Sequence, residues 1–533
     1  MKKIKYILGT LVLCAAVTSC VWDLNVTPID PNANTVDKVL TDKASLDRYI
    51  SGVYLGFATS GYYGPNGGAS ISGLDGGASQ YIRGLFHLEE LTTDECVCGW
   101  NDQTIKNFHY MNWTTDDTFI YAFHSRILMQ VSSANEFIRE VKQVDFDAAL
   151  QKRYIDEARA MRAIAYYHAI DCFGNVPFAT DEDIVGVNPP QISRTDLFNW
   201  LENELKDIMA NGALPERANV EPGHIGMGAV KFLLAKLYLN AQVYTGTDRF
   251  NDCANILKDL MDDGYSLHTT PNGTTFSAYQ DLFAADNDRC TDEIIFSVEQ
   301  DGLYTQSYGV TNYIIFASTG GAMDPYEMGI SSGWGGLRTT PEFYHKFSSG
   351  DARNLFYTET QQEDIEDIGE FTHGMAFRKF RNVRSVDGDV PNKAWNEDDA
   401  KWTGPSFVST DFPMMRYADV LLMAAECQLR GASVNGAIAG FNSVRARAGL
   451  AAISNPSLQD ILDERGRELY QECWRRSDLI RFGQFTSGYN WQWKGGEKDG
   501  IDVDSYRALF PIPDSDRLAN SNLQQNPGYG TNK

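Results

Sequence analysis

The chain has 533 residues, of which 43% are hydrophobic and 22% are charged, so it can bury a large core and has the composition of a folded protein. Its formal net charge of −25 disfavours nucleic acid and strongly acidic molecules as partners, because like charges repel. Neutral ligands, or a basic protein partner, fit this charge better.

The N-terminus has the pattern of a secretory signal. Three lysines precede an apolar run over residues 7–17, which is too short to span a bilayer. The run leads into the tetrapeptide VTSC, which resembles a bacterial lipobox with Cys20 as the lipidated first residue; ordinary signal cleavage beside an incidental cysteine is the alternative. We therefore expect a lipoprotein signal peptide over residues 1–19 and a lipidated tether over residues 20–40, anchored stably by several acyl chains.

Apolar residues recur at helical spacing in two later parts of the chain. In residues 229–262 this spacing continues on both sides of the breaker TGTDR, which predicts a helix pair about one tetratricopeptide repeat long. The segments RYIDEARAMRAIAYYHAIDCFG and RYADVLLMAAECQLR show the same periodicity. The predicted fold is mainly α, a tetratricopeptide-like scaffold of helical repeats over residues 118–262 and 414–480. An irregular helical bundle is the alternative.

Large irregular excursions separate the helical parts. Residues 60–115 and 265–412 are rich in Gly, Asn, Asp, Thr and aromatic residues. They contain only a few short strand candidates, such as EIIFSVEQ and TNYIIFAST. Because loops of this length inside a compact domain are usually functional, we expect the ligand-binding residues on these excursions.

Two common catalytic motifs are missing from the sequence. It has no HExxH and no P-loop. Acidic residues are so abundant that a carboxylate pair indicates nothing without geometry. Cys96 and Cys98 are one residue apart, but they lack a second pair of ligands for zinc. Setting Cys14 and Cys20 aside leaves seven scattered cysteines, which do not form a disulfide framework.

One acidic segment, ADNDRCTDE, could present oxygens to calcium through Asp286 and Asp288. It lacks the glycine and the distant glutamate of an EF-hand loop, so a solvated acidic loop is the favoured interpretation. Apart from this structural calcium we expect no cofactor.

Two tryptophans stand in polar, glycine-containing segments of the excursions. Trp100 lies in CGWNDQ and Trp334 in SSGWGG, and both contexts favour exposed rings. Trp491 and Trp493 alternate with Gln492 and are expected to pack structurally. Exposed indole rings can stack on the apolar faces of sugars, much as aromatic side chains stack on bases.

Two segments near the C-terminus carry a family resemblance. LDERGRELYQECWRRSDLIRFGQF (residues 462–485) and FPIPDSDRLANSNLQQNPGY (residues 510–529) resemble the signatures of the SusD/RagB family of outer-membrane lipoproteins of Bacteroidota. The resemblance implies a single SusD-like domain over residues 41–533. It also implies a non-catalytic, cell-surface glycan-binding protein that delivers oligosaccharides to a SusC-like TonB-dependent transporter. Other surface glycan-binding lipoproteins and amylases are implied as further partners.

Within that family the sequence resembles the founding, starch-binding member most. The matching stretches are ELTTDEC before Trp100, LDGGASQYIR, SSGWGG and WQWKGG. The resemblance implies a site for α-1,4-glucan at Asp75, Arg83, Trp100, Gln103, Tyr308 and Trp334. Gln103 stands where that protein has Asn, and Cys98 stands where it has a further Trp, so one ring of the aromatic arc is missing.

Three alternatives stay open at this stage. A SusD-like binder of another polysaccharide, such as a fructan, a pectin or a host glycan, is favoured by the missing ring at Cys98. A lipoprotein glycoside hydrolase would need two carboxylates on either side of the scissile bond. A scaffold that binds only protein is disfavoured by the exposed tryptophans.

Overall fold

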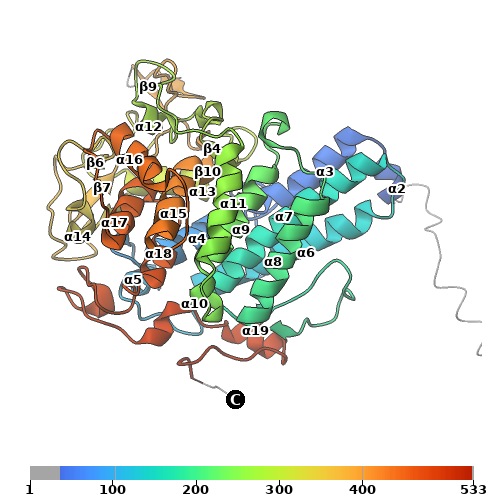
Figure 1. Ribbon diagram of the computed structural model, residues 1–533. Coiled ribbons are helices and arrows are strands. Elements are labelled where there is room, and N and C mark those ends of the chain that lie inside the picture. The colour runs from blue at the N-terminus through green and yellow to red at the C-terminus, as the bar shows by residue number, and fades with distance from the viewer. Residues whose placement is uncertain (1–35, 103, 399, 531–533) are drawn as a thin grey trace, which may run out of the picture.

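The computed structural model describes residues 36–102, 104–398 and 400–530, and most of its regular structure is helical, as predicted (Figure 1). Within these ranges, no helix is both long and apolar enough to cross a membrane. The signal segment and Cys20 lie outside the described residues.

In the first helical part, the longer helices lie side by side (Figure 1). Their starts follow from capping residues: the carboxylate of Asp117 accepts hydrogen bonds from the amides of Phe119 and Ile120 at 2.9 and 3.1 Å. Asp147 caps the next helix in the same way. The helices are α2 (Val36–Val39), α3 (Lys43–Leu55), α6 (Thr118–Val141), α7 (Ala148–Cys172), α8 (Arg194–Asn211), α9 (Met227–Leu239), α10 (Ala241–Thr245) and α11 (Phe250–Asp262).

The second helical part packs against the first through α11 and α15. Within this second part the helices pack closely, because a Cβ added to Gly440 would lie only 3.0 Å from the side chain of Leu421. The helices of this part are α15 (Tyr417–Leu429), α16 (Ala437–Arg447), α17 (Leu458–Leu469) and α18 (Arg475–Arg481). A later short helix, α19 (Asp514–Ala519), lies against α6 of the first part, where a carboxylate oxygen of Asp516 is 2.5 Å from Nδ1 of His124.

The excursions contain short helices and short strands, and one further pair of strands lies between α7 and α8 of the first helical part. A four-stranded antiparallel sheet has the order β1 (Val97–Cys98), β5 (Leu337–Thr339), β7 (Met375–Phe377), β6 (Phe356–Tyr357). Three two-stranded sheets pair β4 (Ile294–Val298) with β10 (Phe412–Arg416), β2 (Val176–Pro177) with β3 (Gln191–Ile192), and β8 (Ala394–Asn396) with β9 (Lys401–Thr403). The short helices are α4 (Tyr81–Glu89), α5 (Ile105–His109), α12 (Ala278–Asp281), α13 (Val310–Ser318) and α14 (Pro341–Tyr344).

One of the two strand predictions is wrong. EIIFSVEQ forms β4 as expected, but TNYIIFAST forms most of helix α13. Every residue of α13 is buried, so tertiary packing overrides the strand preference of its β-branched and aromatic residues. Gly309 precedes the helix as its N-cap.

The arginines of the C-terminal signature are buried and form ion pairs. Arg475 binds Asp94 through two hydrogen bonds of 2.7 Å, and Arg476 contacts both Glu89 and Asp171 at 3.0 and 2.9 Å. Buried charges need such partners, because an unpaired charge in the interior is strongly destabilising. These pairs attach α18 to α4 and to the ELTTDEC turn, which leads directly into β1.

Candidate functional site

The register of two strands sets the position of Trp100. Strand β1 pairs with β5 so that Cys98 lies opposite Leu337, and the amide of Gly99 donates to the Gly336 carbonyl at 3.1 Å. The next residue along, Trp100, therefore reaches the loop before β5. Its indole Nε1 donates a 2.8 Å hydrogen bond to the carbonyl of Gly335.

Gly336 lets the Trp100 indole ring approach this loop. Gly336 has φ +114°, and a Cβ added there would lie 2.3 Å from Nε1 of Trp100. Only glycine adopts such a backbone conformation readily. The buried guanidinium of Arg338 holds the same loop through 2.8 Å bonds to the carbonyls of Gly336 and Ile368.

Helix α13 supports the second tryptophan. The amide of Trp334 donates to the carbonyl of Phe316 at 2.8 Å, and the two rings pack with centroids 4.9 Å apart. Trp334 and Trp100 are then neighbours, with ring centroids 6.3 Å apart. Tyr313 of α13 packs against Trp100 from within, with centroids 5.8 Å apart and the planes nearly perpendicular.

Tyr308, two residues before α13, joins the same surface. Its ring centroid lies 6.0 Å from that of Trp334, and its hydroxyl donates to the side-chain oxygen of Asn66 at 2.9 Å. Asn66 belongs to the loop of the first excursion, so both excursions meet here. Two residues after Tyr308, the backbone of Val310 has φ +50°, which is an uncommon conformation for a β-branched residue.

Arg83 and Asp75 lie around these rings but differ in exposure. Arg83 is 7% exposed, and its guanidinium carbon lies 5.6 Å from the Trp100 ring centroid and 4.6 Å from that of Tyr313. Burial lowers the pKa of the Arg83 guanidinium below its usual range. The guanidinium donates a 2.9 Å hydrogen bond to the Gly77 carbonyl, so it lies beneath Trp100 and bonds to the backbone of the protein itself. Asp75 is exposed and accepts from the amide of Gly77 at 2.7 Å.

The structure therefore brings five of the six predicted site residues together. Trp100, Tyr308 and Trp334 are each partly exposed and form a row of rings, with Arg83 beneath it and Asp75 beside Gly77 at its edge. Gln103 lies outside the described residues.

Two further rings extend this surface and were missed from the sequence. Phe407 packs on Tyr308 with centroids 5.3 Å apart and is partly exposed. Phe371 is 37% exposed, and a Cβ on Gly335 would lie 2.9 Å from its ring. We call Trp100, Trp334, Tyr308 and Phe407 the aromatic row. No local signal marks Phe407 or Phe371, because each reaches the row through contacts with residues far away in the sequence.

The two cysteines of ELTTDECVCGW are both buried. Cys98 is 1% exposed, and burial raises the pKa of its thiol to about 11, so it stays protonated at neutral pH. It lies under the row, near Arg83 and Arg338. All seven cysteines of the described chain are free and buried, in agreement with the expectation of no disulfide framework.

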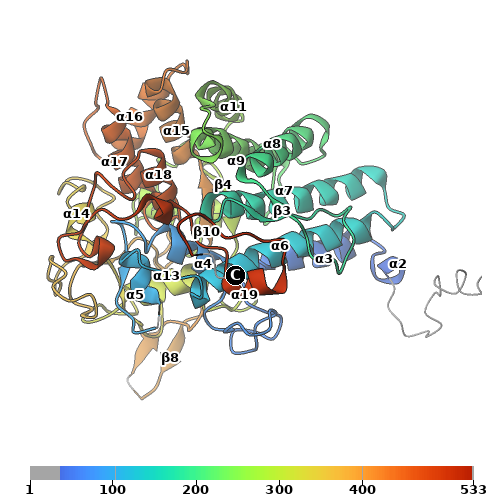
Figure 2. The same cartoon turned by 90° about the horizontal axis from the view of Figure 1, so that it is seen from below.

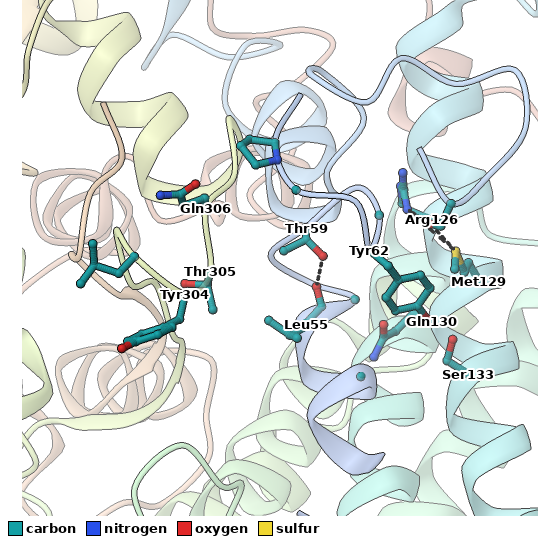
Figure 3. A pocket seen from close by; sticks show the side chains of 17 residues that line it. Leu55, Thr59, Tyr62, Arg126, Met129, Gln130, Ser133, Tyr304, Thr305 and Gln306 are labelled. Atoms are coloured by element: carbon teal, nitrogen blue, oxygen red, sulfur yellow. Dashed lines mark hydrogen bonds between the residues drawn. The ribbon is translucent and has the colours of Figure 1, made fainter. Parts of the chain in front are cut away.

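A cavity of about 370 Å³ is lined by part of the loop over residues 61–70, by α6 and by residues 303–306 (Figure 3). Arg126 lines it and is 3% exposed. Its guanidinium donates to the carbonyls of Ser79 and Ser60 at 2.5 and 2.8 Å, and to the Ser70 hydroxyl at 3.0 Å. Arg126 therefore holds both ends of the loop that borders the aromatic row.

The predicted calcium segment has one buried and one exposed carboxylate. Asp286 accepts hydrogen bonds from the amides of Ser385 and Val386 at 2.6 and 3.3 Å, while Asp288 is exposed. Among the described residues, a cluster with metal-ligand geometry occurs elsewhere, at Glu89, Asp171 and Cys172. Arg476 already neutralises that cluster, so we interpret it as part of the buried ion-pair network.

Comparison with known proteins identifies the family. The sequence model of the SusD family matches residues 356–529. Over 97% of its length the chain is 30% identical to the starch-binding protein SusD of Bacteroides thetaiotaomicron, and the alignment covers 97% of that protein. The chain belongs to the SusD family. It is also 26% identical to a SusD-like protein of Bacteroides ovatus, over 70% of this chain and 68% of that protein.

Solved structures share the fold of this SusD-family chain. A SusD superfamily protein from Parabacteroides distasonis matches with a TM-score of 0.69 at 22% identity, over 92% of this chain and 100% of that one. Surface glycan-binding protein A from Bacteroides thetaiotaomicron, solved in complex with laminarihexaose, matches with a TM-score of 0.68 at 18% identity, over 91% and 100% of the two chains. At these identities the similarity establishes the fold alone.

Proposed function

We propose that this protein is a non-catalytic, cell-surface binder of starch and α-1,4-glucan oligosaccharides. The observation that carries the proposal is the aromatic row, with consecutive ring centroids 5.3, 6.0 and 6.3 Å apart and every ring partly exposed. The starch-binding relative, 30% identical over nearly the whole chain, supports the same class of ligand.

The row suits a curved, neutral sugar chain. Neighbouring rings are tilted by 44° to 58° relative to one another, so together they present a bent surface. A helical α-glucan can follow such a surface better than a flat β-1,4-glucan. The net charge of −25 also favours a ligand without acidic groups.

Stacking sets the expected strength of binding. One aromatic ring contributes roughly 1–3 kcal/mol against a base, and we take sugars to lie at the lower end. The exposed carboxylate of Asp75 and the hydroxyl of Tyr308 can then pair with sugar hydroxyls. Three or four such rings on an open surface correspond to weak affinity, with Kd on the order of 1 mM to 0.1 mM.

The cellular setting follows from family membership and from the N-terminal sequence. We propose that Cys20 carries the lipid anchor, that the protein lies on the outer face of the outer membrane, and that it delivers glycan to a SusC-like TonB-dependent transporter. Amylases and other surface glycan-binding lipoproteins would act on the same polymer. A structural calcium at Asp286 and Asp288 stays an untested alternative to a solvated acidic loop.

A second candidate is a SusD-like binder of another polysaccharide, such as a fructan, a pectin or a host glycan. One observation favours it: position 98 holds a buried cysteine, which offers no ring to a ligand. A fold relative bound to laminarihexaose shows that this fold accepts a β-glucan as well.

Titration calorimetry of the mature chain against maltoheptaose, α-cyclodextrin, inulin and laminarihexaose tests these alternatives. Trp334→Ala should weaken α-glucan binding by about fivefold, and the matched control Trp334→Phe should retain most of it, because a ring remains. Heat with inulin or laminarihexaose alone would reject the starch assignment in favour of the second candidate. Release of reducing ends from any of these glycans would contradict the non-catalytic assignment.

A further inference from the structure

A hairpin with two tryptophans projects from the body of the protein at β8 (Figure 2). Its strands pair so that Trp395 lies directly opposite Trp402. The two rings meet edge to face, with centroids 5.4 Å apart and planes at 73°. Such a cross-strand pair helps to hold a short hairpin together.

The contact between the two rings stabilises the hairpin, but it does not explain the large exposed fraction of each ring. Trp395 is 50% exposed and Trp402 is 45% exposed. Large rings left open to water side by side are typical of binding surfaces, since indole combines a wide apolar face with a hydrogen-bond donor.

The hairpin forms one wall of a groove of about 530 Å³. The opposite wall comes from the segment of Asp324, Pro325 and Tyr326, and from Ile330 and Ser331. The polar groups along the groove are one carboxylate at Asp324, one ammonium at Lys401, and hydroxyls at Tyr326, Ser331 and Thr403. Aromatic rings, hydroxyls and balanced charge together fit an uncharged ligand that is rich in hydroxyl groups.

Two segments of the chain connect the groove to the aromatic row. The amide of Ser331 donates to the carbonyl of Pro405 at 2.9 Å, and a Cβ on Gly404 would lie 2.6 Å from the backbone of Ile330. Three residues after Ser331 comes Trp334, so their Cα atoms are within about 11 Å of each other. Two residues after Pro405 comes Phe407, the end of the aromatic row.

We propose that the groove beside Trp395 and Trp402 is a second glycan subsite, which extends the aromatic row for long chains. This inference rests on the proposed function, because it takes the ligand on the row to be a neutral polysaccharide. A short oligosaccharide occupies the row alone. A long chain continues past Phe407 and Ser331 onto the tryptophan hairpin, so the hairpin raises affinity only for long ligands.

The test compares a short and a long ligand on the same variants. Calorimetry with maltotriose and with soluble amylose is carried out on the wild type, on the double variant Trp395→Ala/Trp402→Ala, and on Trp334→Ala. Trp395→Phe/Trp402→Phe is the conservative control that keeps two rings on the hairpin. Ile184→Ala is the surface control, because Ile184 is 79% exposed and lines neither the row nor the groove.

We expect the double alanine variant to bind amylose about 25-fold more weakly, fivefold for each ring removed, and maltotriose as the wild type does. Trp334→Ala should weaken both ligands, and the two controls should weaken neither. An unchanged amylose affinity in the double alanine variant, with Trp334→Ala still impaired, would overturn the second subsite and leave the proposed function intact. Wild-type protein that binds neither α-glucan would overturn both.

Discussion

Replacing Gly336 by alanine tests whether the position of Trp100 determines glycan affinity. The added Cβ would lie 2.3 Å from the indole Nε1, and its neighbour Gly335 is the hydrogen-bond acceptor of that group. Relief of this clash requires Trp100 to move, since the rest of the loop is held by Arg338. We therefore expect Gly336→Ala to weaken glycan binding although residue 336 has no side chain that a sugar could contact.

The magnitude follows from two separable effects. The first effect is a lower free energy of unfolding. Alanine at a φ of +114° costs about 1–3 kcal/mol, and loss of the Trp100–Gly335 hydrogen bond costs about 1 kcal/mol more. Displacement of one stacking ring lowers binding by about 1 kcal/mol at the low end of the stacking range, which raises Kd about fivefold.

A matched control separates the clash from the backbone effect. Gly321 also has a positive φ, +60°, but a Cβ there meets nothing within 4 Å. Gly321→Ala should lower stability through the backbone alone and leave Kd unchanged. Calorimetry gives Kd, and denaturant unfolding followed by circular dichroism gives the change in the free energy of unfolding.

A double-mutant cycle decides whether the effect acts through Trp100. If Gly336→Ala acts by displacing the ring, it should add no further loss of affinity in a Trp100→Ala background. Wild-type Kd in the single variant, or additive losses in the double variant, would refute the reasoning that the loop positions Trp100.

Three further predictions concern the scaffold. Arg416 is fully buried among Glu293, Glu468 and Glu472, so Arg416→Met should lower the free energy of unfolding by about 3–5 kcal/mol. Arg384→Met, in an exposed pair, should lower it by less than about 1 kcal/mol. Similar losses in the two variants would contradict the larger contribution of the buried ion pairs. Burial raises the pKa of Asp411 to about 8, so the folded state keeps a proton that the unfolded state loses above about pH 4, and stability falls as pH rises from 4 to 8. Asp411→Asn should reduce the loss of stability between pH 5 and pH 8 by up to about 4 kcal/mol in urea titrations, and an unchanged pH profile would argue against a protonated Asp411. Arg126→Met removes the anchor of the loop with Asn66 and Asp75, and should raise the Kd for maltoheptaose by about fivefold without touching the sugar; unchanged affinity would show that the loop keeps its place without Arg126.

Much of the helical scaffold could be predicted from the sequence, because amphipathic periodicity is a local signal. The segments predicted as helical contain α7, α9, α11 and α15. The failure at TNYIIFAST has a physical reason: a helix buried on all sides has no polar face, so periodicity cannot distinguish it from a buried strand.

The candidate site could be predicted only through the family resemblance. Glycine-rich context alone indicated exposed rings at Trp100 and Trp334, and both are partly exposed. Their proximity depends on the register of β1 with β5, which joins residues more than two hundred positions apart. The contact of Phe407 with Tyr308 depends on tertiary packing in the same way and has no counterpart in local sequence.

The segment that the family model matches and three of the four rings of the aromatic row lie in different parts of this chain. The SusD family model matches residues 356–529, which include the signature arginines but not Trp100, Tyr308 or Trp334. The link between the two is structural: Arg475 and Arg476 bind Asp94 and Glu89, in the segment that leads into β1 and Trp100. The signature arginines therefore hold the segment that leads to Trp100, and under the proposed function we expect the rings carried on the excursions to determine which sugar chain fits. Changing Trp100 or Trp334 should alter the glycan at little cost in stability, whereas changing Arg475 should destabilise the fold and weaken binding of every glycan alike.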